Sequence, residues 1–270
     1  MTPLSRSNRS YAIVPLLLSA ILVVAFVVVP PLAVPVARGG VDLSSRAQGV
    51  ITAWVAEGSA ERPAALRDFV EGWRDYHVVK AALAAAAGLA LWRVAREARR
   101  RWVVGGRAYG QAVTLVVASG LAFFAALVVL ANLQGALAPL ASAVSLLPSA
   151  DGDASYAATL ARLSAQVSAG RPTGAAGAVL TDFAFFHLVL AALAWLLAIG
   201  LGIGSFRLLR RRLRARHDVS TPRREKLLLT TLSAPIAAAA LFALVVASAN
   251  ISTAGDPAPE LTAFLDGLGG

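Results

Sequence analysis

Five long apolar stretches constrain the fold of this chain more than any other feature. They run from Tyr11 to Val36, His77 to Val94, Tyr109 to Leu133, Phe183 to Phe206 and Leu227 to Ile251. A helix needs about 20 apolar residues to cross the hydrocarbon core, and it satisfies its backbone hydrogen bonds internally. The sequence therefore predicts an all-α membrane bundle of five transmembrane helices.

The first stretch follows Arg6 and Arg9, as the apolar core of a secretory signal peptide follows basic residues. Such a core usually has about 7–15 residues, and this stretch is longer. We therefore interpret residues 1–36 as an uncleaved N-terminal transmembrane anchor.

Basic residues are concentrated in two connections between the apolar stretches. One connection holds Arg96, Arg99, Arg100, Arg101 and Arg107, and the other holds Arg207, Arg210, Arg211, Arg212, Arg214, Arg216, Arg223, Arg224 and Lys226. The intervening connections and the tail after Ile251 lack such an excess. Because basic residues mark the cytoplasmic side, we predict a cytoplasmic N-terminus, an external C-terminus and a multi-pass location in the plasma membrane.

The overall composition agrees with this interpretation. The net charge of +10 lies in short runs between apolar spans, so it favours contact with anionic lipid headgroups and does not indicate nucleic acid. Alanine and arginine are abundant, whereas Lys80 and Lys226 are the only lysines. This composition is typical of a GC-rich bacterial genome and predicts a bacterial inner membrane.

Two of the predicted spans begin alike, which indicates an internal repeat. The pattern H-x-V-x-A-A-L-A starts at His77 and again at His187, each after an aromatic residue. A basic connection follows each of these spans, and the returning spans end near Asn132 and Asn250. We interpret this as a duplicated helical hairpin in parallel orientation.

The repeat divides the chain after the anchor into residues 37–150 and residues 151–270, each an external segment followed by a transmembrane hairpin. Apolar residues at helical spacing predict short amphipathic helices outside the spans. They are Leu66, Phe69, Val70, Trp73 and His77; Leu137, Leu140, Val144 and Leu147; Tyr156, Leu160, Leu163 and Val167; and Leu261, Phe264, Leu265 and Leu268. Their apolar faces can pack on the bilayer surface or on one another.

His77 and His187 are the candidate functional residues because the repeat places them at equivalent positions. Two facing histidines can bind haem iron or a metal, or relay protons. We favour the simpler interpretation that each histidine anchors its helix at the interface, beside Tyr76 or Phe186. No spacing of acidic residues matches a metal signature, so we predict no metal site and keep haem as the alternative cofactor.

Other polar and small residues in the spans are candidates for a pathway or an interface. Lys80 lies one turn inside the second span, from where its stem can snorkel outward. Asn132 and Asn250 can hydrogen-bond across helices or cap helix ends. Gly200 and Gly204 form a Gly-x-x-x-Gly pattern, which permits close helix packing within the chain or in a dimer.

The sequence offers little for catalysis. It contains no cysteine, no Gly-x-Ser-x-Gly or His-Glu-x-x-His motif, and no acidic residue within the five spans. We therefore predict no catalytic residues and a non-enzymatic accessory or scaffold component of the cell envelope, with a membrane protein or a second copy as partner. One alternative is a small channel or transporter with a pathway near His77, His187 and Lys80. The other is a haem-binding redox protein using the same two histidines.

Overall fold

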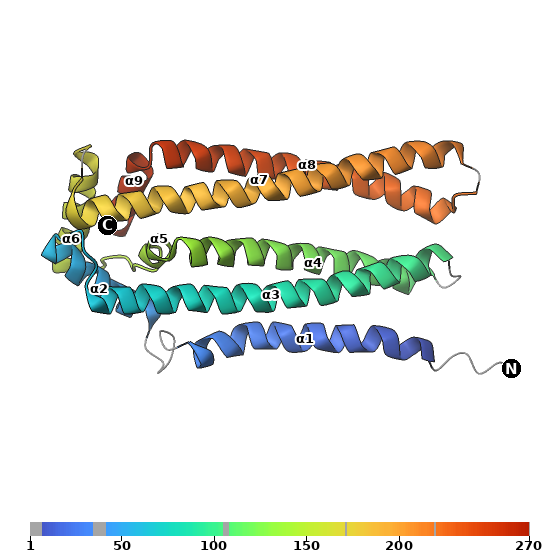
Figure 1. Ribbon diagram of the computed structural model, residues 1–270, viewed down its shortest axis with the longest axis horizontal. Coiled ribbons are helices and arrows are strands. Elements are labelled where there is room, and N and C mark those ends of the chain that lie inside the picture. The colour runs from blue at the N-terminus through green and yellow to red at the C-terminus, as the bar shows by residue number, and fades with distance from the viewer. Residues whose placement is uncertain (1–6, 35–41, 105–107, 171, 219, 270) are drawn as a thin grey trace. The chain divides into compact units, whose positions relative to one another are not determined.

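The computed structural model describes residues 7–34, 42–104, 108–170, 172–218 and 220–269, and this part of the chain is helical, without strands. Four helices are long and apolar enough to cross a membrane: α3 (Ala64–Val104), α4 (Ala108–Leu137), α7 (Gly174–His217) and α8 (Arg223–Gly255) (Figure 1). Helix α1 (Ser7–Ala33) contributes a shorter apolar segment, Leu17–Ala33. The predicted all-α membrane helical bundle is thereby confirmed. The predicted end of the first span at Val36 lies outside the described residues.

Helices α3 and α7 extend far beyond the predicted spans. Their 41 and 44 residues correspond to lengths of about 62 and 66 Å at about 1.5 Å per residue. The hydrocarbon core is only about 30 Å thick. In α3 the predicted amphipathic segment and the span form one helix, and in α7 the span continues through the arginine run. Arginine is a good helix former, so nothing in that run ends the helix.

Contacts within the chain divide it into two compact units. We call the first the span unit; it comprises Met1–Val27, Ala81–Leu130 and Ala194–Val246. We call the second the short-helix unit; it comprises Val28–Lys80, Ala131–Leu193 and Ala247–Gly270. Each of the four long helices contributes residues to both units.

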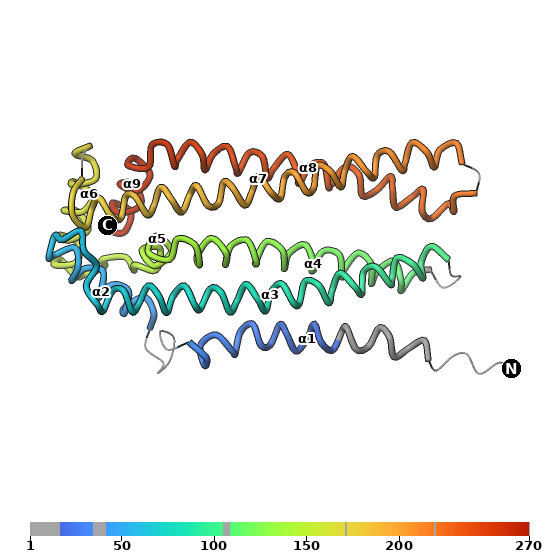
Figure 2. Tube along the Cα trace, viewed as in Figure 1, coloured from blue at the N-terminus to red at the C-terminus, as the bar shows by residue number. Residues whose placement is uncertain are grey.

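In the span unit, α3 packs closely on α4. A Cβ at Gly88 of α3 would lie 3.3 Å from the Cβ of Ala125 of α4, an approach that a small residue permits. The arginine-rich ends of α3 and α8 are also connected, because Arg99 pairs with Glu225 at 3.1 Å and Arg224 donates to the Trp102 carbonyl. Figure 2 traces α3 beside α4 and α7 beside α8. Most large side chains along these helices are exposed, as contact with lipid requires.

The short-helix unit has a hydrophobic core of its own. Helices α2 (Leu43–Glu57), α5 (Pro139–Val144), α6 (Ala154–Ser168) and α9 (Ala258–Gly269) gather beside the N-terminal parts of α3 and α7 (Figure 1). The predicted amphipathic faces supply much of this core, so they pack on one another. Its buried members include Leu66, Phe69, Val70, Trp73, Leu140, Val144, Leu147, Tyr156, Leu160, Leu163, Val167, Leu261 and Leu265. Leu137 is an exception, being 54% exposed.

Helix α2 was not among the predicted helices, although its start carries a clear signal. Asp42 accepts hydrogen bonds from the backbone N–H groups of Ser44 and Ser45, and Asp153 caps α6 in the same way. Such caps satisfy N–H groups that have no partner within the helix. Trp54 and Ile51 of α2 are then buried in the core.

Candidate functional site

His77 lies in a polar network within the short-helix unit. Its ring Nδ1 lies 3.0 Å from Oδ1 of Asn132 in α4, and its Nε2 lies 3.2 Å from Oγ of Ser142 in α5. Because the Asn132 oxygen can only accept, Nδ1 donates and Nε2 accepts from the Ser142 hydroxyl. The Ser142 oxygen in turn accepts from Nε1 of Trp73 at 3.1 Å. The network therefore suits a neutral histidine and connects three helices.

Close packing fixes the position of the His77 ring. Gly135 lies directly against it, since a Cβ on this glycine would be 2.6 Å from Nε2. The Trp73 ring meets the imidazole edge-on, with 4.6 Å between ring centroids. Any substituent on Gly135 would therefore displace a ring that has little room to move.

His187 has a closely similar environment. Its Nδ1 lies 2.7 Å from Oδ1 of Asn250 in α8. Each histidine is also contacted edge-on by the aromatic residues one and four positions before it in its helix. These residues are Trp73 and Tyr76 in α3, and Phe183 and Phe186 in α7. The same local arrangement thus occurs twice in the unit.

The two environments also differ. Thr253 stands three residues after Asn250, at the place that Gly135 takes after Asn132, and its hydroxyl donates to Glu260 at 2.9 Å. Gln134 connects the two hairpins, because its side-chain amide donates to the Phe186 carbonyl at 3.3 Å. This bond joins α4 to α7 next to His187, within the short-helix unit.

Ser142, His77 and Asn132 follow the order of nucleophile, base and orienting group that occurs in hydrolases. Two features oppose that chemistry. Ser142 is only 7% exposed, and its oxygen is already engaged by Trp73. A reacting carbonyl must reach the nucleophile and hydrogen-bond donors together, and the burial of Ser142 prevents this.

Ligation of haem iron or a metal by His77 fits the arrangement poorly. An iron ligand needs a ring nitrogen with a free lone pair, whereas both nitrogens of His77 are hydrogen-bonded. Among the described residues, no group of three or more histidine and acidic side chains is placed to hold a metal ion.

Lys80 lies one turn after His77 in α3, and its side chain is directed back toward the N-terminus of that helix. Its ammonium group lies 5.2 Å from the centroid of the Tyr76 ring, one turn earlier in α3. Side chains of a helix tilt toward its N-terminus, so this position agrees with outward snorkelling.

Added Cβ atoms at Gly200 or Gly204 of α7 would meet nothing within 4 Å in the described chain. Close packing at these glycines within the chain is therefore not seen, and packing in a dimer stays a prediction.

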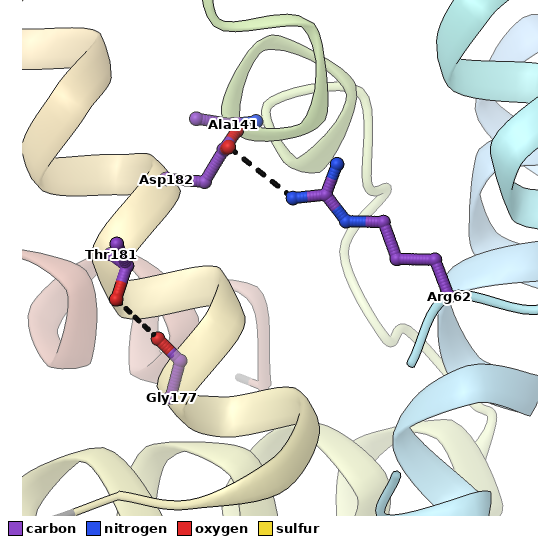
Figure 3. Close-up of polar contacts among 5 residues, drawn as sticks. All are labelled: Arg62, Ala141, Gly177, Thr181 and Asp182. Atoms are coloured by element: carbon purple, nitrogen blue, oxygen red, sulfur yellow. Dashed lines mark hydrogen bonds and ion pairs between the residues drawn. The ribbon is translucent and has the colours of Figure 1, made fainter. Parts of the chain in front are cut away.

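A second polar cluster surrounds Asp182 of α7, which the sequence did not single out as a site residue. Figure 3 shows its carboxylate between the N-terminus of α5 and the side chain of Arg62. One oxygen accepts from the Ala141 N–H at 2.9 Å, and the other pairs with Arg62 at 3.4 Å. The N–H of Ala141 has no partner within α5, so Asp182 caps that helix from another part of the chain.

A polar cleft of about 490 Å³ opens beside this ion pair. Its lining is formed by Ala60, Arg62, Pro172, Thr173, Gly174, Gly177, Ala178, Thr181 and Asp182. The cleft offers both signs of charge and two hydroxyl groups to a partner. A cavity of about 630 Å³ in the span unit is very different, because its lining from α1, α3 and α4 is almost wholly apolar.

Comparison with protein families, curated proteins and solved structures gave no match for this chain.

Proposed function

We propose that this chain is a non-enzymatic accessory or scaffold component of the cell envelope. It would be a multi-pass protein of the bacterial plasma membrane, with the short-helix unit outside and the arginine-rich helix ends in the cytoplasm. The separate hydrophobic core of the short-helix unit carries the proposal. A unit that folds around its own core can present a fixed surface to another protein.

The state of the polar groups in this unit supports the same role. In the described residues, every buried side-chain nitrogen and oxygen has a hydrogen-bond partner. Satisfied polar networks stabilise one arrangement of the helices. We infer that His77 and His187 tie the helices together through Asn132 and Asn250 and do not bind a cofactor.

We also propose that residues 37–150 and 151–270 arose by duplication. Helices α2 and α6 have 15 residues each, α3 and α7 have 41 and 44, and α4 and α8 have 30 and 33. The repeated histidine–asparagine bonds and aromatic contacts support this proposal more strongly than the similarity of the two amino-acid segments does. The final helices differ more, with 6 residues in α5 and 12 in α9.

The two alternatives have less support. A haem protein would require His77 to give up one of its hydrogen bonds. A transport pathway near Lys80 would require a polar passage, whereas the cavity in the span unit is apolar. The polar cleft beside Arg62 is the better candidate for recognition of a protein partner.

Purification of the tagged full chain from its native membrane tests the proposal. We expect a membrane or envelope protein to co-purify in stoichiometric amount in mild detergent. Thr173→Trp, which fills the cleft, should abolish co-purification, whereas Gln166→Trp on the exposed face of α6 should preserve it. Light scattering separates a foreign partner from a second copy of this chain.

A different result would contradict the proposal. A pure chain that catalyses a defined reaction, or that carries ions into liposomes without a partner, is not an accessory protein. A haem absorption spectrum that disappears in His187→Ala would support the redox alternative.

A further inference from the structure

The part of α7 that follows its apolar span carries an unusual concentration of arginine. A concave surface of about 440 Å³ in the span unit is lined by Gly204, Arg207, Leu208, Arg210, Arg211 and Arg214. Gly204 lacks a side chain, and an added Cβ would meet nothing within 4 Å. The glycine therefore leaves a hollow beneath the first arginines, which we call the arginine notch.

Helical geometry gathers these arginines on one face. Arg207, Arg211 and Arg214 are spaced by four and three residues, so they project from the same side of α7. Arg212 and Arg216 project from the opposite side by the same reasoning. Arg210 flanks the notch, with its guanidinium 5.4 Å from the centroid of the Phe206 ring.

The arginines of the notch lack acidic partners among the described residues. The carboxylates of Glu97 and Glu225 pair with Arg101 and Arg99 of α3 instead. An uncompensated cluster of guanidinium groups attracts a phosphate, which it can bind through paired hydrogen bonds.

In the predicted topology, the notch lies at the depth of lipid headgroups. Arg207 directly follows the apolar run that ends at Phe206, a ring that is 57% exposed. The headgroup layer extends about 5–8 Å beyond the hydrocarbon core on each side. Arg211 lies four residues further, or about 6 Å along the axis. Both arginines thus fall within the headgroup layer, and an aromatic ring there is typical of a membrane interface.

We propose that the arginine notch binds the phosphate group of an anionic phospholipid. The inference rests on the proposed location in the plasma membrane. It assigns the contact with anionic headgroups, which the charge pattern predicts, to one face of one helix. Arg207 and Arg211 hold the phosphate, Arg214 adds charge from the next turn, and the space above Gly204 admits the headgroup. The lipid tails then lie along the exposed apolar side chains of α7.

The test is a titration of the delipidated full chain with phosphatidylglycerol, with binding followed by native mass spectrometry. Arg207→Gln/Arg211→Gln is compared with Arg212→Gln/Arg216→Gln, which removes the same charge from the opposite face. A hydrogen bond to a charged group contributes about tenfold or more in affinity, so loss of both arginine contacts to the phosphate should weaken binding by the notch variant about 100-fold. The control variant should retain the wild-type affinity.

The other arms identify the ligand. Phosphatidylcholine should bind far more weakly than phosphatidylglycerol, and inorganic phosphate should not displace the lipid. Arg207→Lys/Arg211→Lys should recover part of the affinity, because lysine keeps the charge without the bidentate geometry. Equal losses in the notch and control variants would overturn the proposal, as would full displacement by inorganic phosphate. Co-purification of an envelope partner is a separate readout, so failure of the lipid site leaves the scaffold proposal standing.

Discussion

His77 and Asn132 are 55 residues apart in the sequence, yet the ring Nδ1 and the amide Oδ1 lie 3.0 Å from each other. An equivalent bond joins His187 and Asn250 across 63 residues. Each bond connects the outgoing and returning helices of one hairpin. The residues that mark the sequence repeat are therefore also the residues that tie each hairpin in the short-helix unit.

Replacing Asn132 by leucine should destabilise the protein, because the Nδ1–H of His77 would lose its acceptor while remaining largely buried. An unsatisfied buried donor costs about 1–3 kcal/mol. Thermal unfolding in mild detergent measures the change. His77→Leu combined with Asn132→Leu should cost less than the two single changes together, because the loss of the shared bond is then counted only once. Additive losses in this cycle would show that the bond contributes nothing.

Gly135→Ala should also destabilise the protein, because the new Cβ would lie 2.6 Å from Nε2 of His77. Bonds to Asn132 and Ser142 hold that ring, so it cannot move cheaply, and overpacking of this kind costs about 1–3 kcal/mol. Gly120→Ala in the same helix is the matched control, because nothing lies within 4 Å of its added Cβ. Alanine favours a helix over glycine by about 1 kcal/mol, so the control should unfold at a higher temperature. Equal behaviour of the two variants would contradict the packing argument.

The membrane bundle could be predicted because apolar length is a local property of the sequence. Both histidines and both asparagines could also be selected, since the repeat marks them. Their pairing could not, because it depends on how α3 meets α4 and how α7 meets α8. One further sign of the repeat was present in the sequence. An aromatic residue, Trp73 or Phe183, stands four positions before each histidine.

The hydrogen-bond partners of several polar residues could not be predicted from the sequence. Ser142 and Gln134 look like ordinary polar residues of helix ends, and only tertiary packing brings them to His77 and Phe186. The role of Asp182 also depends on tertiary packing, because its partners come from α5 and from the segment before α3. The sequence also could not show whether the amphipathic faces pack on the membrane surface or on one another. That outcome depends on the positions of several helices.

Acid should weaken the start of α6 through Asp153. Hydrogen bonds from the Tyr156 N–H, and then from Ser155, lower the pKa of this carboxyl below its usual value of 3.8. A lowered pKa means that the carboxylate stabilises the folded state above the ordinary value, and that this contribution disappears as the pH falls through the lowered pKa. Asp153→Asn retains a capping oxygen without a charge. Its unfolding temperature should therefore fall less than that of the wild type between pH 5 and about 2, the range in which acid protonates such a carboxylate.

Alkali should act on the same region through Tyr156. This side chain is buried and donates to the Pro148 carbonyl, and burial raises the pKa of its phenol from 10.0 to about 12. Above pH 10 the unfolded chain ionises while the folded chain does not, so stability falls as the pH rises from about 10 to about 12. Tyr156→Phe should remove this dependence, which thermal unfolding at several alkaline pH values measures. An unchanged alkaline slope in the variant would assign the effect to other groups.

The Asp182 cluster separates the contribution of a cap from that of an ion pair. Asp182→Ala removes the acceptor of the Ala141 N–H and the partner of Arg62 together, whereas Arg62→Ala removes only the ion pair. Loss of the cap should cost about 1–3 kcal/mol, and loss of a partly exposed ion pair about 0–1 kcal/mol. Asp182→Asn keeps an oxygen for Ala141 without the charge, so its unfolding temperature should lie near that of Arg62→Ala.

Added salt provides a second test of the ion pair. It should lower the unfolding temperature of the wild type toward that of Arg62→Ala and leave that of Asp182→Ala nearly unchanged, because screening acts on the ion pair and not on the cap. If Arg62→Ala were as unstable as Asp182→Ala, the carboxylate would stabilise the protein through its charge. Its hydrogen bond to the Ala141 N–H would then contribute nothing to stability.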